Sequence, residues 1–275
     1  TRKKGWAISS SVKGYTHKLL YGGKIEAISD SFDVNEIGYV PWSGSKKGAV
    51  FLGPNLQFSH GFLKSLYMGP AIIIFRKPLD LSWSKGAAIE FNPIFRNNWG
   101  FYIDFCVGDY CYVDLNYFYH GIEISIWGSS SKYSTYCGNS FNYSYNYYRD
   151  FLAYQNSSWF WFKYSIIPRM TIALSGNIWV EWNTANAVIA TTTMPTPRLE
   201  FHITKDISFG IFNEFIFATP ETDLISNRLG FLFSWNFLPK SWLYIAFNDY
   251  QKNSGTGLKL QERTGAIKAK YLIYF

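Results

Sequence analysis

The residues best able to do acid–base or metal chemistry are the four histidines, His17, His60, His120 and His202. Zinc ligands converge through short spacing or a helical register, and no two of these histidines form such a motif. The alternating pattern places His120 on a polar face and His202 between Glu200 and Thr204. Neighbours across strands can still assemble a metal site or proton relay there. The simpler interpretation is hydrogen-bonded histidines, so we assign no catalytic, cofactor-binding or metal residue and expect no cofactor.

Ser59-His60-Gly61 contains the only serine that directly precedes a histidine. A hydrolytic site needs a Ser–His pair with an orienting acid or amide. Adjacent residues of a strand point to opposite faces, so Ser59 and His60 can cooperate only from a loop. The chain contains no Gly-x-Ser-x-Gly elbow, phosphate loop or calcium loop. We therefore expect no enzymatic activity.

The three cysteines leave the question of a disulfide open. Cys106 and Cys111 flank Val107-Gly108-Asp109-Tyr110, which reads as a hairpin turn. Opposed strand residues place their β-carbons about 4.5–5.5 Å apart, slightly beyond the usual separation in a disulfide. The alternatives are a Cys106–Cys111 bridge, a bridge to Cys137, or no bridge.

The composition excludes several classes of protein. The 275 residues carry a formal net charge of +7, only 16% are charged, and 20% are aromatic. Disordered chains have few aromatic residues, so disorder is excluded. The basic excess raises nucleic acid as a partner, but Lys and Arg are scattered and the aromatic residues follow an alternating pattern. We expect no nucleic-acid partner, and expect basic residues near strand ends to meet lipid headgroups.

Apolar and polar residues alternate with a period of two along most of the chain, which predicts strands. Leu199–Ile203 and Ile207–Ile211 alternate on either side of Lys205-Asp206, which predicts a hairpin. The same pattern recurs over 171–181, 99–106 and 267–275. Each segment is about ten residues long, the length of a tilted strand that crosses a bilayer. No apolar run reaches the roughly 18 residues of a membrane-spanning helix.

Three features favour a membrane barrel over a water-soluble β-sandwich. No segment offers a helix to cover the apolar faces, and the chain ends on Phe275 with apolar residues at alternate positions before it. Aromatic residues crowd the segment ends, where interfacial girdles lie. They include Trp235, Phe237, Trp242, Tyr244, Tyr271 and Tyr274. The predicted fold is an all-β, antiparallel transmembrane β-barrel of roughly 12–16 strands, or the C-terminal part of one, in the bacterial outer membrane.

The alternation also predicts which side chains meet lipid and which face the interior. The lipid-facing set is Leu174, Phe201, Ile203, Phe209 and Ile273, and the interior set is Asn177, Glu200 and Lys268, with Lys163 and Lys270 as further interior cations. Two stretches break the pattern, Ser29–Lys47 and Ser129–Ser158. We interpret both as long loops, either for extracellular contact or without a partner.

Both ends of the chain resemble an uncharacterised Bacteroidetes-type family. The resemblance lies in Asn227–Trp235, Leu238–Tyr244 and Lys268–Phe275, which look like closing strands of its outer-membrane barrel, and in the loop Asp30–Val40. In that family a carbohydrate-binding-family-nine-like domain precedes the barrel. The family has no established activity, so no catalytic residue carries over. This chain has Pro239-Lys240-Ser241 where the family usually has Pro-Gly-Ser, a change that we expect to leave the fold intact.

The resemblance implies that residues 1–275 are one outer-membrane barrel domain, the C-terminal part of a longer polypeptide. We therefore expect the partner of the last strand, 266–275, to lie outside this sequence, because the first candidate strand, 6–15, is weakly patterned. The predicted function is transport or a structural role in an outer-membrane assembly. The alternative is an outer-membrane hydrolase of lipid or glycan. The expected partners are outer-membrane lipid and other outer-membrane or periplasmic proteins.

Overall fold

Every regular element in the described part of the chain is a β-strand. The computed structural model describes residues 5–16, 18–32, 43–220 and 222–272. The strands are β1 (Ala7–Tyr15), β2 (Leu19–Ile28), β3 (Lys46–Gln57), β4 (Leu63–Arg76), β5 (Ser84–Phe95), β6 (Trp99–Tyr112), β7 (Leu115–Ser129), β8 (Tyr133–Asn146), β9 (Phe151–Ile167), β10 (Met170–Trp182), β11 (Val188–His202), β12 (Ile207–Thr219), β13 (Thr222–Leu238), β14 (Ser241–Asn253) and β15 (Leu258–Lys270). Among these residues, no helix has the length and apolar character needed to cross a membrane.

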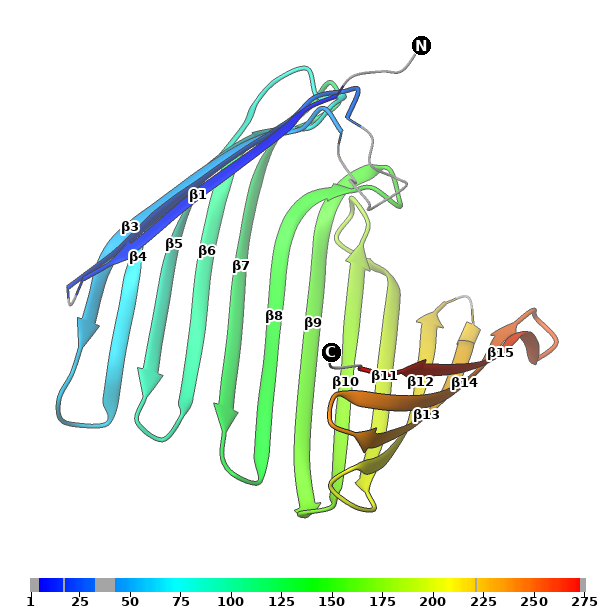
Figure 1. Ribbon diagram of the computed structural model, residues 1–275. Helices are drawn as coiled ribbons and strands as arrows, with labels where there is room; N and C mark the ends of the chain where they lie inside the picture. The colour runs from blue at the N-terminus through cyan, green and yellow to red at the C-terminus, as the bar shows by residue number, and fades with distance from the viewer. Residues whose placement is uncertain (1–4, 17, 33–42, 221, 273–275) are drawn as a thin grey trace. The chain divides into compact units, whose positions relative to one another are not determined.

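Strands that follow one another in the chain are hydrogen-bonded neighbours, in the order β1 to β15 (Figure 1). The pairing is antiparallel, which tight turns permit and which parallel strands could not achieve without long crossovers. Two residues suffice to connect β9 to β10 and β13 to β14. The described residues form 15 strands, a number within the predicted range.

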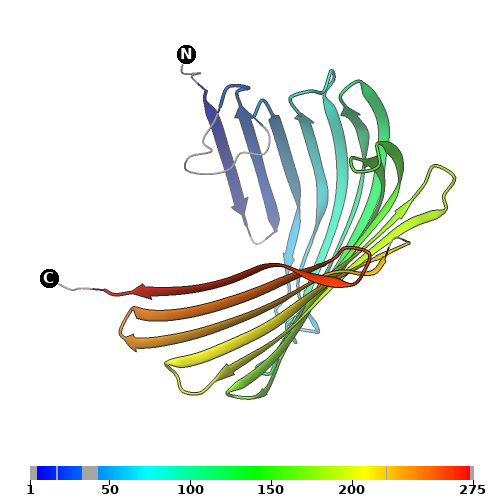
Figure 2. The same ribbon diagram turned by 90° about the vertical axis from the view of Figure 1, so that its right-hand side faces the viewer.

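The chain forms two compact units, which are described separately. The first comprises Thr1–Ile126 and Ser140–Gln155, and the second comprises Trp127–Asn139 and Asn156–Phe275. Strands β1 to β6 therefore belong wholly to the first unit, and β10 to β15 to the second. Within the second unit, the strands coloured yellow to red lie side by side in one layer (Figure 2).

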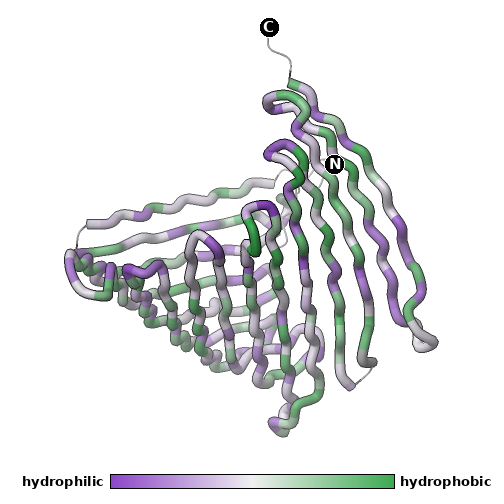
Figure 3. Tube along the Cα trace, turned by 90° about the horizontal axis from the view of Figure 1, so that it is seen from below, coloured by the Kyte–Doolittle hydropathy of each residue, from purple (hydrophilic) through white to green (hydrophobic). Residues whose placement is uncertain are grey.

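Hydropathy alternates along the strands, as the sequence predicts (Figure 3). Exposure is distributed in the opposite way to that of a water-soluble protein. On β4, the apolar side chains of Met68, Ile72 and Ile74 are exposed, whereas Ser65 and Tyr67 are buried. Water-soluble monomers rarely expose contiguous apolar patches of this kind. The exposed apolar face is therefore one that requires lipid.

The hairpin predicted around Lys205-Asp206 is confirmed. Strands β11 and β12 are joined by residues 203–206, and Phe201 pairs with Phe209 across them. The Ile203 and Thr204 amides both bond the Ile207 carbonyl, at 2.9 and 3.3 Å, which closes the turn. The patterns over 171–181 and 99–106 likewise form β10 and β6.

The turn predicted between Cys106 and Cys111 is wrong, because β6 runs straight through both residues. Gly108 is needed for a close approach between strands, since a Cβ there would lie 2.2 Å from the Lys85 carbonyl oxygen. Five residues of extended chain place the two Cα atoms about 17 Å apart, too far for a bridge. Cys106, Cys111 and Cys137 are all free.

The long loop predicted over Ser129–Ser158 is also wrong, because the segment forms β8 and the start of β9. Its Asn and Ser side chains bond one another between strands. Asn139 Nδ2 donates to Ser158 Oγ at 2.7 Å, and Asn156 Nδ2 donates to Asn139 Oδ1 at 3.0 Å. These polar residues therefore belong to strands whose neighbours satisfy them.

The loop predicted over Ser29–Lys47 does separate two strands, β2 and β3, although β3 already begins at Lys46. Residues 33–42 lie outside the described residues. The first and last predicted strands form β1 and β15, while Ile273, Tyr274 and Phe275 lie outside the described residues. The expectation that the last strand pairs outside this sequence stays a prediction.

Candidate functional site

The register of the second unit sorts its side chains into two faces, as the alternation predicts. Leu174 pairs with Pro197, and Phe201 pairs with Phe209, which places Leu174, Phe201 and Phe209 on one face. Glu200 pairs with Thr171, which places it on the other face together with Asn177. Successive pairs across β11 to β15 bring Lys268 to the same face as Glu200.

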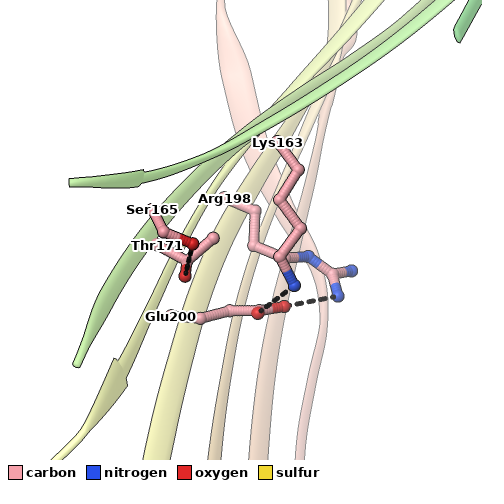
Figure 4. A network of polar contacts seen from close by, with 5 residues as sticks. All are labelled: Lys163, Ser165, Thr171, Arg198 and Glu200. Carbon is pink, nitrogen blue, oxygen red and sulfur yellow. Dashed lines mark hydrogen bonds and ion pairs between the residues drawn. The ribbon is translucent and has the colours of Figure 1, made fainter. Parts of the chain in front are cut away.

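Three charged side chains on the polar face of the second unit, Lys163, Arg198 and Glu200, form a network (Figure 4). Lys163 Nζ on β9 donates to Glu200 Oε2 on β11 at 3.3 Å, reaching across β10. Arg198 lies 3.8 Å from the other oxygen of the same carboxylate. Beside them, the hydroxyls of Ser165 and Thr171 are 3.4 Å apart. Charges in hydrocarbon are costly, so this partly exposed network marks the face that meets water.

A groove of about 210 Å³ runs beside this network on β11, β12 and β13. Arg198, Glu200, His202 and Gly210 are among the residues that line it. The Arg198 guanidinium lies 5.5 Å from the centroid of the Phe212 ring, which stabilises the cation by a cation–π contact. The groove offers a cation, an anion and an aromatic face to a polar solute.

The polar face of the first unit is rich in tyrosine and acidic side chains. The Tyr110 ring stacks on Tyr119 at 4.5 Å between centroids and meets Phe75 edge-on at 5.1 Å. Further along the same face, Glu90 on β5 lies directly opposite Asp104 on β6. Sequence reasoning did not single out these residues. Their signal was present, because they occupy the polar positions of strands whose other positions are apolar.

The described histidines do not assemble a site. His17 lies outside the described residues. His60 is exposed in the turn between β3 and β4, which Arg96 holds by donating to the carbonyl oxygens of Gly61, at 2.8 Å, and Phe58. Among the described residues, no hydrogen bond or ion pair links Ser59, His60 and an acid. His202 ends β11 and lines the groove.

The polar face predicted for His120 is wrong. Its ring lies 5.9 Å from Phe118 and 5.5 Å from Tyr143, in stacked arrangements. It shares its side of β7 with Phe118 and Ile122, which are exposed apolar residues. Asn116 points to the same side of β7 as His120, but it lies at the start of the strand. Its polar side chain therefore does not indicate that the middle of this side is polar. His120 belongs to an aromatic cluster on the lipid-facing side.

The aromatic girdle predicted near the C-terminus divides between the two faces. Trp235 contacts Phe237 at 5.7 Å, and Phe237 stacks on Tyr271 at 6.3 Å. Tyr244 pairs with Ser234 on the polar face. The Trp242 ring stacks on the Tyr244 ring, with 5.9 Å between their centroids. Adjacent strand positions face opposite ways, so only Trp235, Phe237 and Tyr271 form a lipid-facing belt. Tyr274 lies outside the described residues.

The described residues contain no cluster of three or more His, Cys, Asp or Glu side chains arranged to hold a metal ion. What the polar faces offer instead is a set of paired charges, carboxylates and aromatic rings spread over several strands. Such surfaces suit weak contact with passing solutes.

No family model and no curated protein matches the chain. Solved structures do match. The outer membrane channel DcaP of Acinetobacter baumannii has a TM-score of 0.54 at 10% identity, covering 96% of this chain and 84% of that one. The OmpT outer membrane protein of Vibrio cholerae, in its trimer form, has a TM-score of 0.37 at 10% identity and covers 96% of each chain. The NanC porin has a TM-score of 0.36 at 10% identity, over 69% of this chain and 94% of that one.

The likeness to DcaP concerns the fold, which is that of the antiparallel outer-membrane β-barrels. The strand pairing and the exposed apolar face agree with this class. The predicted fold class is therefore confirmed.

Proposed function

We propose that this protein is a channel of the bacterial outer membrane that lets small hydrophilic solutes cross along its polar faces. The observation that carries the proposal is the division of the strands into an exposed apolar face and a face with paired charges. A protein that only anchored an assembly would not need cations, carboxylates and aromatic rings along the second face. The fold shared with the DcaP channel supports the same function.

The proposal extends to location and partners. An exposed apolar face with aromatic belts at its edge suits outer-membrane lipid, which we propose as the immediate partner. The resemblance of the chain ends to the Bacteroidetes-type family points to a bacterial source of that group. The second function that the sequence predicts is a structural role within a larger outer-membrane assembly, with other outer-membrane or periplasmic proteins. Among the described residues, no particular contact favours that role over transport.

The hydrolase alternative rested on Ser59 and His60. Arg96 engages the backbone of their turn, and His60 forms no hydrogen bond or ion pair among the described residues. This arrangement gives the turn a structural explanation and does not orient the imidazole. Transport is therefore the function that the geometry supports better.

The test is reconstitution of the purified, folded protein into planar lipid bilayers in KCl. We expect stepwise conductance increases, and swelling of proteoliposomes in small neutral sugars but not in large ones. Heat-denatured protein and empty bilayers are the controls. Protein that inserts, resists protease on its spanning strands, and yet conducts no ions and admits no sugar would overturn the proposal.

A further inference from the structure

Carboxylates without counter-ions gather on the polar face of the first unit. Glu90 on β5 and Asp104 on β6 are directly opposed across their strands. Glu123 on β7 lies close enough to Asp104 to interact with it electrostatically. Like charges directly opposite one another destabilise a strand pair. Among the described residues, none of the three carboxylates forms an ion pair with Lys, Arg or His.

A second observation is a group of buried polar atoms without hydrogen-bond partners, on Asp104 itself and on two neighbouring uncharged side chains. Tyr67 on β4 is only 8% exposed, and its hydroxyl has no hydrogen-bond partner. Tyr67 pairs with Asn92, which lies two positions from Glu90 and therefore on the same face. The buried Oδ1 atoms of Asn92 and Asp104 also lack a partner. Unsatisfied buried polar atoms are costly, so they indicate that something else supplies the hydrogen bonds.

The chemistry of these groups defines what they would bind. Carboxylates and an amide oxygen only accept hydrogen bonds, so the ligand must donate them, and the local negative charge requires that it be cationic. The described residues hold no three acidic, His or Cys side chains placed to chelate one metal ion. An extended cation with several N–H groups can instead bridge acceptors that lie on neighbouring strands.

We propose that this acidic patch, formed by Tyr67, Glu90, Asn92, Asp104 and Glu123, is a binding site for organic cations that carry ammonium groups. The proposal rests on the channel function, because a solute reaches the patch along the polar face. It specifies a solute class that the channel function alone does not. Partial exposure of the three carboxylates leaves them accessible to such a solute. The neighbouring ring of Tyr102 adds a face suited to cation–π contact.

The test is calorimetric titration of the folded protein in detergent with 1,4-diaminobutane. The double variant Glu90→Gln/Asp104→Asn should weaken the apparent association constant by about tenfold or more, because it removes two charge-assisted acceptors. The variant should fold at least as well as the wild type, since it removes opposed like charges. Tyr67→Phe, which deletes a single oxygen, should weaken binding by about threefold and provides a second variant with an unchanged charge.

The matched control is Glu26→Gln/Glu262→Gln, which removes the same charge elsewhere. Glu26 is ion-paired with Lys24, and Glu262 accepts a hydrogen bond from Thr264. We expect the control to change binding by less than about twofold. Equal losses in both double variants would show diffuse electrostatic attraction and overturn the proposal. Wild-type protein that does not bind the diamine, or that binds magnesium ions at the same site more tightly, would overturn it as well.

Binding is measured without any conduction, so the two proposals fail separately. A protein that binds the diamine but forms no conducting pore retains the site and loses the channel. A protein that conducts ions but does not bind the diamine retains the channel and loses the site. In a conducting protein, the patch variant should also shift the reversal potential across a KCl gradient toward anion selectivity more than the control variant does.

Discussion

At the scale of the residue, the ion pairs on the polar face of the second unit contribute little to stability. The side chains of Lys163 and Glu200 are 40% and 33% exposed, so water screens their attraction. Exposed ion pairs of this kind contribute about 0–1 kcal/mol to stability. Their geometry nevertheless keeps a carboxylate next to two cations on a surface that a solute would pass.

Replacing Glu200 by Gln should therefore lower the free energy of unfolding by less than about 1 kcal/mol. In a conducting protein it should also shift the reversal potential across a KCl gradient toward anions, because Lys163 and Arg198 lose their counter-charge. Lys163→Gln is the matched variant and should shift the potential toward cations. Urea titration followed by tryptophan fluorescence measures the first effect. A shift of the same sign in both variants would contradict the assignment of this face to water.

The sequence predicted part of this residue-scale chemistry. Glu200 could be placed on a polar face because it lies within a clear alternation, whereas Lys163 could be recognised as a cation that interrupts an apolar run. Tyr67 and Asn92 could not be singled out, because their importance depends on the register between β4 and β5 and on which acceptors lack donors. His120 was misplaced because a polar residue at the start of its strand suggested the wrong face.

At the scale of the element, Gly69 lies at a point where β4 comes very close to β3. A Cβ on Gly69 of β4 would lie 2.6 Å from the Leu52 carbonyl oxygen and 2.7 Å from the Gly53 Cα. These atoms are backbone and cannot move aside without shifting β3. In contrast, a Cβ on Gly265 of β15 would meet no atom within 4 Å.

Gly69→Ala should destabilise the protein by about 1–3 kcal/mol, the usual cost of forcing an extra carbon into a packed site. Gly265→Ala should be neutral or stabilise by up to about 1 kcal/mol, because alanine restricts the unfolded chain. Urea titration of both variants in the same lipid gives the comparison. Equal effects at the two positions would mean that β3 and β4 are not packed as closely as described.

The turn between β13 and β14 carries backbone strain at one residue. Lys240 has a φ of 60°, in the left-handed region, directly after Pro239. Proline followed by a residue with positive φ is the pattern of a type II turn, which favours glycine at the second position. Strands β13 and β14 still pair across the turn, as expected.

Lys240→Gly should raise the free energy of unfolding by about 1 kcal/mol, because glycine adopts this conformation without a steric cost. Lys240→Ala removes the same charge but keeps the Cβ, and should produce no such gain. The two unfolding midpoints, measured by urea titration, separate the backbone effect from the charge effect. A gain in the alanine variant equal to that in the glycine variant would assign the effect to charge.

Alternation predicted the strands themselves better than the points where they end. The segment 129–158 reads as a loop because Ser, Asn and Tyr dominate it, yet those residues bond one another between strands. Gly108 reads as a turn residue, although its role is to let β5 and β6 approach closely. In both cases the composition of a segment is ambiguous, and only the neighbouring strand decides between turn and strand.

At the scale of the whole molecule, the distribution of apolar surface determines where the protein can exist. Large apolar side chains are exposed on strands of both units, including Ile72, Ile89, Leu174 and Ile267. A water-soluble protein would bury such residues against a second layer. The sequence predicted this because it offers apolar faces throughout and no segment to cover them. The register of the second unit then identifies which side chain of each strand belongs to the apolar face.

The sharpest test of this division compares two arginines on one strand. Leu174 on β10 is 41% exposed on the apolar face, and Asn177, three positions on, lies on the polar face with Glu200. Arginine in place of a lipid-facing residue near the bilayer midplane costs about 2–4 kcal/mol, because its charge must leave water. Leu174→Arg should therefore lower the free energy of unfolding in phospholipid bilayers by about that amount. Asn177→Arg should change it by less than about 1 kcal/mol, because its charge stays in contact with water.

The measurement is a urea titration of both variants in vesicles of identical composition. Equal costs at the two positions would mean that both faces of β10 lie in similar surroundings, and the separation into a lipid-facing and a water-facing side would then be wrong.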